Sequence, residues 1–268
     1  MYTKILKKNA KWLEARRHRI GYLKKFVKPG KIVEFGCGKG LVLEFLSTNF
    51  PKSLIIGIDK SQARLEELAK KRLKNVIPIL VDITNPIFLN KSFDTALFIA
   101  SLHEIFSCQG KRKVEESFRI AHNVLKDNGT LIVQDFLKPL PKLVEMGFRN
   151  ITTHKRFLRF AAEFKARKVW FQKTTNRVRL DIADALEFIS KYRSPDEADW
   201  QEEMNETHFF FTKKDYETVA KKTGFTIINS LKLAKDKDWW SDTRKDIEFE
   251  FEAEYQWLQL VLKKTKGR

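Results

Sequence analysis

The sequence predicts an α/β protein whose parallel sheet is doubly wound, with helices on both faces. Two observations carry this prediction. The apolar segment 31–35 runs directly into a glycine-rich turn at 36–40, and a second apolar segment ends on Asp59. Strand-like and helical segments then alternate, as expected when helices cross between parallel strands. Ligands of such folds bind at the carboxyl ends of the strands, so we expect the glycine turn and Asp59 to border one crevice.

The boundaries of the alternating elements are marked by residues with clear local roles. Pro29 and Gly30 end a basic amphipathic helix that is predicted over residues 3–27. Ser61 is placed to cap the helix after the second strand, and an Asp-Asn-Gly turn at 127–129 leads into the fifth strand. The predicted strands are 31–35, 54–58, 76–81, 93–100 and 130–136, and the predicted helices between them are 40–49, 61–74 and 111–126.

The alternation stops after the fifth strand, and the segment 138–208 is predicted to be an inserted helical cap. Within residues 153–168, apolar side chains recur at the spacing of one helix face. Ser194 followed by Pro195 forms a typical helix start. We expect this cap to lie over the carboxyl edge of the sheet. The apolar face consists of Phe157, Phe160, Ala161 and Phe164.

The alternation resumes toward the end of the chain. Thr212 with Asp215 three positions later resembles a capping box, and Gly224 is placed to end that helix. Two further strands complete a seven-stranded sheet with a C-terminal β-hairpin. These strands are 225–233 and 249–262, and a polar loop that contains Trp239 and Trp240 separates them.

Composition limits the class of protein. The 268 residues are 43% hydrophobic and include 22 Phe, enough for one large domain or one domain with an insertion. No stretch approaches the roughly 18–20 uninterrupted apolar residues of a membrane span, and the basic N-terminal region lacks the apolar core of a secretory signal. Cys37 and Cys108 are the two cysteines, with no zinc-type spacing. We therefore expect no disulfide, no metal and a cytoplasmic protein.

The formal net charge is +18 and is unevenly distributed. Residues 1–31 carry eleven Lys or Arg against Glu14 alone, and residues 138–180 carry twelve against two acids. Two basic blocks can form a surface for RNA, anionic lipid or a phosphorylated small molecule. A lysine-rich proteome, in which Lys is the default surface residue, explains the same charge. The charge therefore leaves RNA as a partner open.

The spacing of the turn distinguishes between nucleoside cofactors. The glycines follow the pattern G-x-G-x-G, and Leu41 stands where a dinucleotide fingerprint needs its third glycine. Glu34 lies two residues before the first glycine. This E-x-G-x-G-x-G pattern resembles the first motif of class I S-adenosylmethionine (AdoMet)-dependent methyltransferases, and seven strands with a terminal hairpin match their sheet. The resemblance covers residues 31–137 and 209–263. It implies an AdoMet-binding domain over residues 31–137 and 209–268. Residues 1–30 would form a basic N-terminal helix, and residues 138–208 a helical cap insertion.

The resemblance assigns a role to each residue around the predicted crevice. The turn borders the amino-acid portion of AdoMet, which Glu34 orients, and Asp59 accepts hydrogen bonds from both ribose hydroxyls. Asp82 receives the adenine amino proton while Ile83 packs on the ring. As alternatives, Asp59 only caps a helix, Asp82 is a turn residue, and Cys37 is a small residue without a redox role. The cofactor-binding residues implied are Glu34, Gly36, Cys37, Gly38, Gly40, Asp59, Lys60, Asp82, Ile83, Ala100 and Ser101.

The segment after the fourth strand supplies the catalytic candidates. His103 lies where many family members place residues that face the acceptor, and a histidine can act as a base near neutral pH. Asp135, near the end of the fifth strand, points toward the same edge and is a candidate for binding an acceptor hydroxyl or amine. Glu104 is a weaker candidate. Residues 99–102 read Ile-Ala-Ser-Leu, which lacks the Asn-Pro-Pro tetrad of enzymes that methylate adenine or glutamine amides.

The leading hypothesis is an AdoMet-dependent methyltransferase that acts on a small-molecule or lipid-like acceptor enclosed by the cap. Methyl transfer from a sulfonium depends on tight binding of the cofactor and alignment of the acceptor more than on a reactive side chain. RNA methylation is the first alternative, and a non-catalytic AdoMet-binding protein is a more remote one. An NAD-dependent oxidoreductase is disfavoured by Leu41. The sequence does not identify the acceptor or the oligomeric state.

Overall fold

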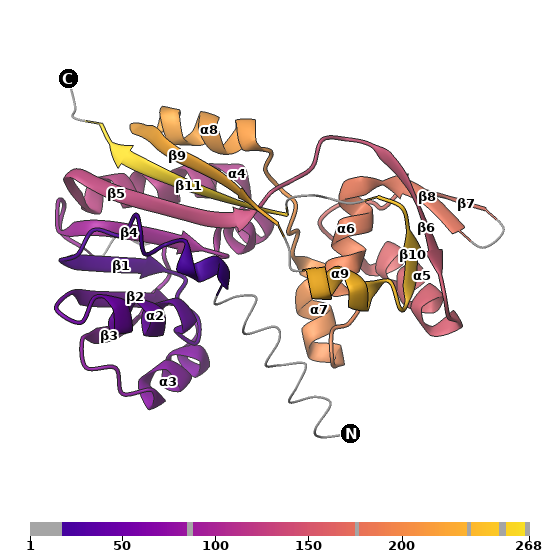
Figure 1. Ribbon diagram of the computed structural model, residues 1–268, viewed down its shortest axis with the longest axis horizontal. Coiled ribbons are helices and arrows are strands. Elements are labelled where there is room, and N and C mark those ends of the chain that lie inside the picture. The colour runs from indigo at the N-terminus through magenta and orange to yellow at the C-terminus, as the bar shows by residue number, and fades with distance from the viewer. Residues whose placement is uncertain (1–17, 85–87, 175–176, 235–236, 252–255, 266–268) are drawn as a thin grey trace.

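The computed structural model describes residues 18–84, 88–174, 177–234, 237–251 and 256–265. Within these residues the chain forms two bodies, an α/β body and a smaller α+β body beside it (Figure 1). The α/β body contains a seven-stranded sheet with the strand order β3-β2-β1-β4-β5-β11-β9. Its strands are β1 (Lys31–Phe35), β2 (Leu54–Asp59), β3 (Val76–Leu80), β4 (Phe93–Ile99), β5 (Leu125–Phe136), β9 (Phe225–Leu233) and β11 (Trp257–Lys264).

The register of the parallel strands brings the predicted site residues to one edge. Phe35, the last residue of β1, pairs with Ile58 of β2 on one side and with Phe98 of β4 on the other. The chain leaving β1, the end of β2 and the chain leaving β4 therefore start at the same level. β11 is antiparallel to both β5 and β9, which confirms the predicted pairing of the last two strands of this sheet.

Helices cover both faces of this sheet, as predicted. One apolar cluster packs α4 (Leu102–Val124) and α8 (Lys213–Lys222) against one face, where Val33 and Phe35 point. A second cluster packs α2 (Leu41–Asn49), α3 (Gln62–Lys70) and part of residues 18–27 against the other face, where Ile32 points. The alternation of side chains along each strand supplies both faces, because successive residues of a strand point to opposite sides.

Predicted local signals are confirmed at several helix ends. The Ser61 hydroxyl accepts a hydrogen bond from the Arg64 backbone N–H and caps α3. Thr212 and Asp215 form the predicted capping box of α8, and Gly224 (φ 84°) follows its end. The start of α4 differs from the prediction, since this helix begins at Leu102 rather than at residue 111 and is kinked at residue 110. Most of the helix predicted over 3–27 lies outside the described residues.

The smaller body corrects the prediction of a helical cap. It contains α5 (Ile151–Glu163), α6 (Ile182–Lys191) and α7 (Glu197–Asn205), but also a four-stranded antiparallel sheet with the order β10-β6-β8-β7. Val144 and Met146 alternate with exposed or small residues along β6, and their side chains are buried against the helices. The strands are β6 (Leu143–Phe148), β7 (Phe171–Lys173), β8 (Arg177–Asp181) and β10 (Ile247–Phe249).

Three further details of the smaller body differ from the prediction. The strand predicted over 249–262 is two strands: β10 pairs with β6 in the small sheet, and only β11 lies in the large one. The connection between β9 and β11 includes α9 (Lys237–Thr243), and the side chain of Trp240 is buried in the core of the smaller body rather than exposed in a polar loop. The helix predicted to start at Ser194 is capped instead by Asp196.

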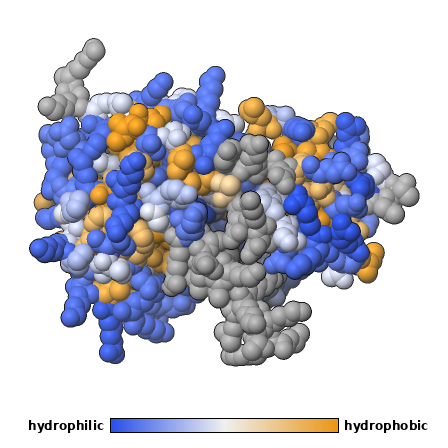
Figure 2. Space-filling view, viewed as in Figure 1, coloured by the Kyte–Doolittle hydropathy of each residue, from blue (hydrophilic) through white to orange (hydrophobic). Residues whose placement is uncertain are grey.

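Most of the visible surface is hydrophilic, interrupted by separate hydrophobic areas (Figure 2). Within the part of the chain that the structure describes, no helix is both long and apolar enough to cross a membrane.

Candidate active site

The glycine turn after β1 is held against the end of β2. The backbone N–H groups of Gly36 and Cys37 both donate to the Ile58 carbonyl over 2.9 Å. Gly36 has φ 77°, and a Cβ at this position would lie 2.7 Å from the Cβ of Ser101. A side chain at residue 36 would therefore collide with the segment that follows β4. Glycine allows the two segments to approach each other across the mouth of the crevice.

Asp59 at the end of β2 joins the turn to the start of α3. Its Oδ2 accepts a hydrogen bond of 2.8 Å from the Gly38 N–H, and its Oδ1 accepts one of 2.9 Å from the Ser61 N–H. The side chain is buried. A carboxylate has about four acceptor positions, so each oxygen keeps capacity for a further donor. Asp59 thus does more than hold the start of a helix, since it also fixes the turn.

These elements border an open cleft at the edge of the sheet, with about 450 Å³ of empty space that includes solvent at its mouth. Asp82 contributes a carboxylate that accepts hydrogen bonds of 2.8 Å from the Thr84 N–H and hydroxyl. The bond from the Thr84 N–H lowers the pKa of Asp82 below its usual value, so Asp82 is ionised at neutral pH. The cavity is lined by Gly36, Asp59, Lys60, Asp82, Ile83, Ser101, Glu104, Ile105, Cys108 and Gln109.

The other predicted cofactor residues support the walls of this cavity rather than line it. Glu34 is buried on β1, and Gly38 lies in the turn, where an added Cβ would meet open space. Gly40 (φ 72°) precedes α2 and packs against α3, and Ala100 adopts φ 55° directly after β4. Burial raises the pKa of the Cys37 thiol well above its usual value, so this side chain remains a neutral thiol.

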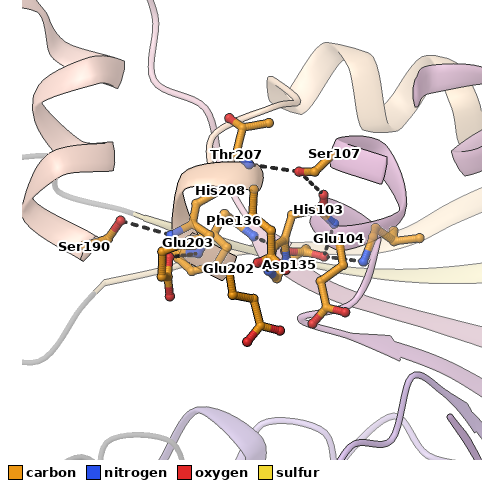
Figure 3. A network of polar contacts seen from close by, with 12 residues as sticks. His103, Glu104, Ser107, Asp135, Phe136, Ser190, Glu202, Glu203, Thr207 and His208 are labelled. Atoms are coloured by element: carbon orange, nitrogen blue, oxygen red, sulfur yellow. Dashed lines mark hydrogen bonds and ion pairs between the residues drawn. The ribbon is translucent and has the colours of Figure 1, made fainter. Parts of the chain in front are cut away.

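The two predicted catalytic residues are in direct contact (Figure 3). Nδ1 of His103 lies 2.8 Å from Oδ1 of Asp135. Asp135 also accepts hydrogen bonds from the backbone N–H groups of Leu102, His103 and Phe136. Its side chain is fully buried. Asp135 therefore contacts His103 and three backbone N–H groups, and its predicted contact with an acceptor group stays a prediction.

The surroundings of His103 shift its proton affinity. Burial on its own lowers the pKa of His103, but the negative charge and hydrogen bond of Asp135 outweigh it and raise the pKa to about 9. Nε2 of His103 lies 4.0 Å from Oε2 of Glu206. Burial raises the pKa of Glu206 to about 7, with the charges of Glu104 and Glu203 adding to this effect and His103 opposing it.

Glu206 and His208 belong to the site but were not predicted from the sequence. Both follow α7 in the smaller body. The ring of His208 stacks on that of Phe136 with centroids 4.2 Å apart and meets the ring of His103 edge-on at 5.2 Å. The one local signal is a histidine that follows an acid-rich stretch. Only the packing of the two bodies brings these side chains to His103.

A buried glutamate on α6 positions this segment. The carboxylate of Glu187 accepts hydrogen bonds from the Thr207 hydroxyl and from the backbone N–H groups of His208 and Phe209. The ammonium of Lys191 lies 3.5 Å from Glu187, and both side chains are fully buried. Since residues 207 and 209 flank His208 on both sides, Glu187 fixes the backbone from which the His208 ring projects.

A second cavity of about 440 Å³ lies between the two bodies. It shares Lys60, Glu104 and Cys108 with the first cavity, so the two are adjacent. Arg64 on α3 crosses this space and forms ion pairs with Glu104 and, at 3.2 Å, with Glu202 of α7. The cavity is lined by Lys60, Ser61, Arg64, Glu104, Cys108, Glu202 and Glu206.

Comparison with known proteins identifies the family. Residues 6–230 match the family model described as a methyltransferase domain. The chain belongs to this methyltransferase family. Over 134 residues this family member is 34% identical to demethylmenaquinone methyltransferase of Thermotoga maritima, a match that covers 50% of the chain and 54% of that protein. Over 57 residues it is 42% identical to trans-aconitate 2-methyltransferase of Acidovorax sp. (strain JS42), covering 21% of the chain and 22% of that protein.

The chain thus spans about half the length of the first of these relatives and about a fifth of the second. A solved structure of an S-adenosylmethionine-dependent methyltransferase from Mesorhizobium loti has a TM-score of 0.57 and 15% identity, and the match covers 91% of this chain and 96% of that one. This likeness shows the class I methyltransferase fold. The chain therefore belongs to a methyltransferase family and shares its fold with an AdoMet-dependent methyltransferase.

Proposed function

We propose that this protein transfers the methyl group of AdoMet to a small-molecule acceptor bound between its two bodies. The observation that carries the proposal is the meeting of Asp59 with the glycine turn at the edge of the first cavity. This pairing of a carboxylate at the end of the second strand with a close-approach turn suits a nucleoside that carries two ribose hydroxyls.

Two features of the cavity support its fit to AdoMet. The hydroxyl of Ser101 is buried and has no hydrogen-bond partner among the described residues. It lines the cavity and is available to a bound ligand. In the turn, the space in front of Gly38 stays open where any larger residue would place its side chain. A buried hydroxyl and an open backbone position are what a closely held ligand requires.

The residues of the first cavity divide between the parts of AdoMet. Asp59 would bind the ribose hydroxyls, and Asp82 with Ile83 would hold the adenine, with Lys60 beside it. The turn residues Gly36, Cys37, Gly38 and Gly40 would border the amino-acid portion, with Glu34 behind them and with Ala100 and Ser101 opposite. AdoMet would supply a methyl group on a positively charged sulfur; as the acceptor bonds to the methyl carbon, the C–S bond would break and S-adenosylhomocysteine would be the leaving group.

The acceptor would enter through the second cavity, between α3 and the end of α7. His103 would lie beside the acceptor, since its Nε2 is 4.0 Å from Glu206, which lines the second cavity, while its Nδ1 is held by Asp135. The two bodies would align the acceptor with the methyl group and exclude water. Alignment of this kind can supply roughly 7–11 kcal/mol of a reaction barrier in favourable cases.

The names of the two relatives support a small acceptor, because they give demethylmenaquinone and trans-aconitate. Neither name supports RNA as the methyl acceptor. A screen of metabolite and RNA pools for transfer of labelled methyl from AdoMet tests the proposal. We expect label in a low-molecular-mass product. Labelled RNA would contradict the acceptor class, and binding of AdoMet without transfer to either pool would favour a non-catalytic protein.

A further inference from the structure

Two imidazole rings and a carboxylate converge where the two bodies meet. His103 comes from α4 of the α/β body, whereas Glu206 and His208 follow α7 of the smaller body. One ligand atom from each of these three residues lies within 4.8 Å of the other two. His103 and His208 are buried, and the side chain of Glu206 is 17% exposed. The cluster therefore has two fixed members and one that can move.

Hydrogen bonds fix which nitrogen of His103 faces the cluster. Asp135 accepts hydrogen bonds from three backbone N–H groups in addition to its contact with the His103 ring, so both of its oxygens act as acceptors. Nδ1 of His103 must therefore carry the hydrogen that it shares with Asp135. In the neutral ring the lone pair is then on Nε2, the atom that lies 4.0 Å from Glu206.

The same reasoning applies to His208. The Ser190 hydroxyl donates to the Glu187 carbonyl, so its oxygen is left to accept a hydrogen bond from Nδ1 of His208 over 3.0 Å. The lone pair of the neutral His208 ring is then on Nε2, which lies 3.4 Å from Oε2 of Glu203. Both rings thus hold Nδ1 in a hydrogen bond, and the Nε2 atoms lie near the carboxylates of Glu206 and Glu203. Histidines that bind metals are oriented in this way.

The charges around the cluster favour a cation. The carboxylates of Glu104, Asp135, Glu203 and Glu206 surround the two rings, with Glu187 behind His208. The cations of the described residues that form ion pairs with this group are Lys191, which is shared by Glu187 and Glu203, Arg167, which lies 3.7 Å from Glu187, and Arg64, which pairs with Glu104 and Glu202. Carboxylates therefore outnumber fixed cations at this point.

We propose that His103, Glu206 and His208 bind a divalent transition-metal ion, with Asp135 and Ser190 orienting the two rings. Ligand atoms at about 2.0–2.1 Å from a tetrahedral ion lie roughly 3.4 Å apart. Each pair of ligand atoms therefore has to approach by less than about 1.5 Å. Rotation of the half-buried Glu206 side chain provides this for the two pairs that include Glu206.

The donor set selects the class of ion. Two imidazole nitrogens and one carboxylate favour zinc, cobalt, nickel or iron over magnesium and calcium, which prefer oxygen ligands. Three protein ligands leave a coordination position for another molecule. Because Glu206 lines the second cavity, that position faces the proposed acceptor space. A metal here would hold an oxygen of the acceptor. This role rests on the proposed function, but the existence of the metal site does not depend on it.

The test is titration of the chelator-treated full chain with Co²⁺, followed by calorimetry and visible absorption, with Mg²⁺ for comparison. We expect one bound Co²⁺ per chain, an absorption band typical of imidazole and carboxylate ligands, and no heat from Mg²⁺. Glu206→Gln and His208→Ala should each weaken Co²⁺ binding by at least about 100-fold, and Ser190→Ala by about 10–100-fold. The matched control is His154→Ala, because His154 stacks on Phe148 away from the cluster.

No Co²⁺ binding by the folded wild-type protein would overturn the proposal, as would equal affinity in Glu206→Gln and the control. Glu206 is part-exposed, so its variant keeps the test valid if His208→Ala does not fold. Calorimetry with AdoMet on the same metal-free protein separates the two proposals. AdoMet binding without Co²⁺ binding would refute the metal site alone, and the reverse would refute the proposed function.

Discussion

The backbone N–H of Gly38 donates a 2.8 Å hydrogen bond to Oδ2 of Asp59, and this bond joins the glycine turn after β1 to the end of β2. The two residues are brought together by the parallel register of the strands that precede them. Asp59 therefore has two roles in our account: it would bind the ribose of AdoMet, and it fixes the turn that borders the rest of the cofactor.

Asp59→Ala should weaken AdoMet binding by about 1.5–3 kcal/mol, because charge-assisted hydrogen bonds are lost. Calorimetry measures this change, and circular dichroism checks that the variant is folded. Asp127→Ala is the control, since Asp127 forms an exposed ion pair with Lys91. Wild-type affinity in folded Asp59→Ala would show that the end of β2 does not hold the cofactor.

His103→Ala should lower turnover by at least about tenfold while the AdoMet dissociation constant stays within about threefold. The physical reason is that Asp135 holds His103 with Nε2 4.0 Å from Glu206, which lines the proposed acceptor space. Single-turnover kinetics and calorimetry measure the two quantities, with His154→Ala as control. If both variants turn over at the wild-type rate, His103 is structural and alignment alone carries the reaction.

Glu187→Gln should lower the free energy of unfolding by about 3 kcal/mol, because one member of a buried ion pair loses its charge. Glu187 accepts three hydrogen bonds and lies beside the fully buried Lys191. Urea denaturation measures the change. Glu202→Gln, at an exposed ion pair, should cost no more than about 1 kcal/mol. Equal stability of the two variants would mean that Glu187 does not hold the segment around His208.

His122 should make the protein less stable as the pH falls. Burial and the charge of Lys264 lower the pKa of His122 below its ordinary value of 6.5. The unfolded chain then takes up this proton at a higher pH than the folded protein does. The contribution of neutral His122 to the free energy of unfolding is therefore fully present above pH 6.5 and is lost as the pH falls. Denaturation between pH 8 and pH 5 should show a smaller loss for His122→Gln than for the wild type. Parallel profiles would contradict this assignment.

The sequence was informative where a local pattern decides the structure. The burial of alternate side chains, the cap at Ser61 and the capping box at Thr212 act within a few residues, so the seven-stranded sheet and its helices could be predicted. The glycine turn and Asp59 could be predicted for the same reason, since each directly follows its own strand.

The smaller body could not be predicted because its sheet depends on contacts between distant segments. β10 pairs with β6 across roughly a hundred residues of chain. The strands of this small sheet are short, so apolar and charged side chains alternate over only a few residues. Glu206 and His208 were missed because no spacing links them to His103. Their chemistry arises only from the packing of the two bodies.

The most direct test of the account is calorimetric titration of the wild-type protein with AdoMet, S-adenosylhomocysteine and NAD. We expect saturable binding of one AdoMet or one S-adenosylhomocysteine per chain, in competition with each other, and no binding of NAD. Saturable NAD binding without AdoMet binding would contradict the assignment of the crevice, and with it the proposed function.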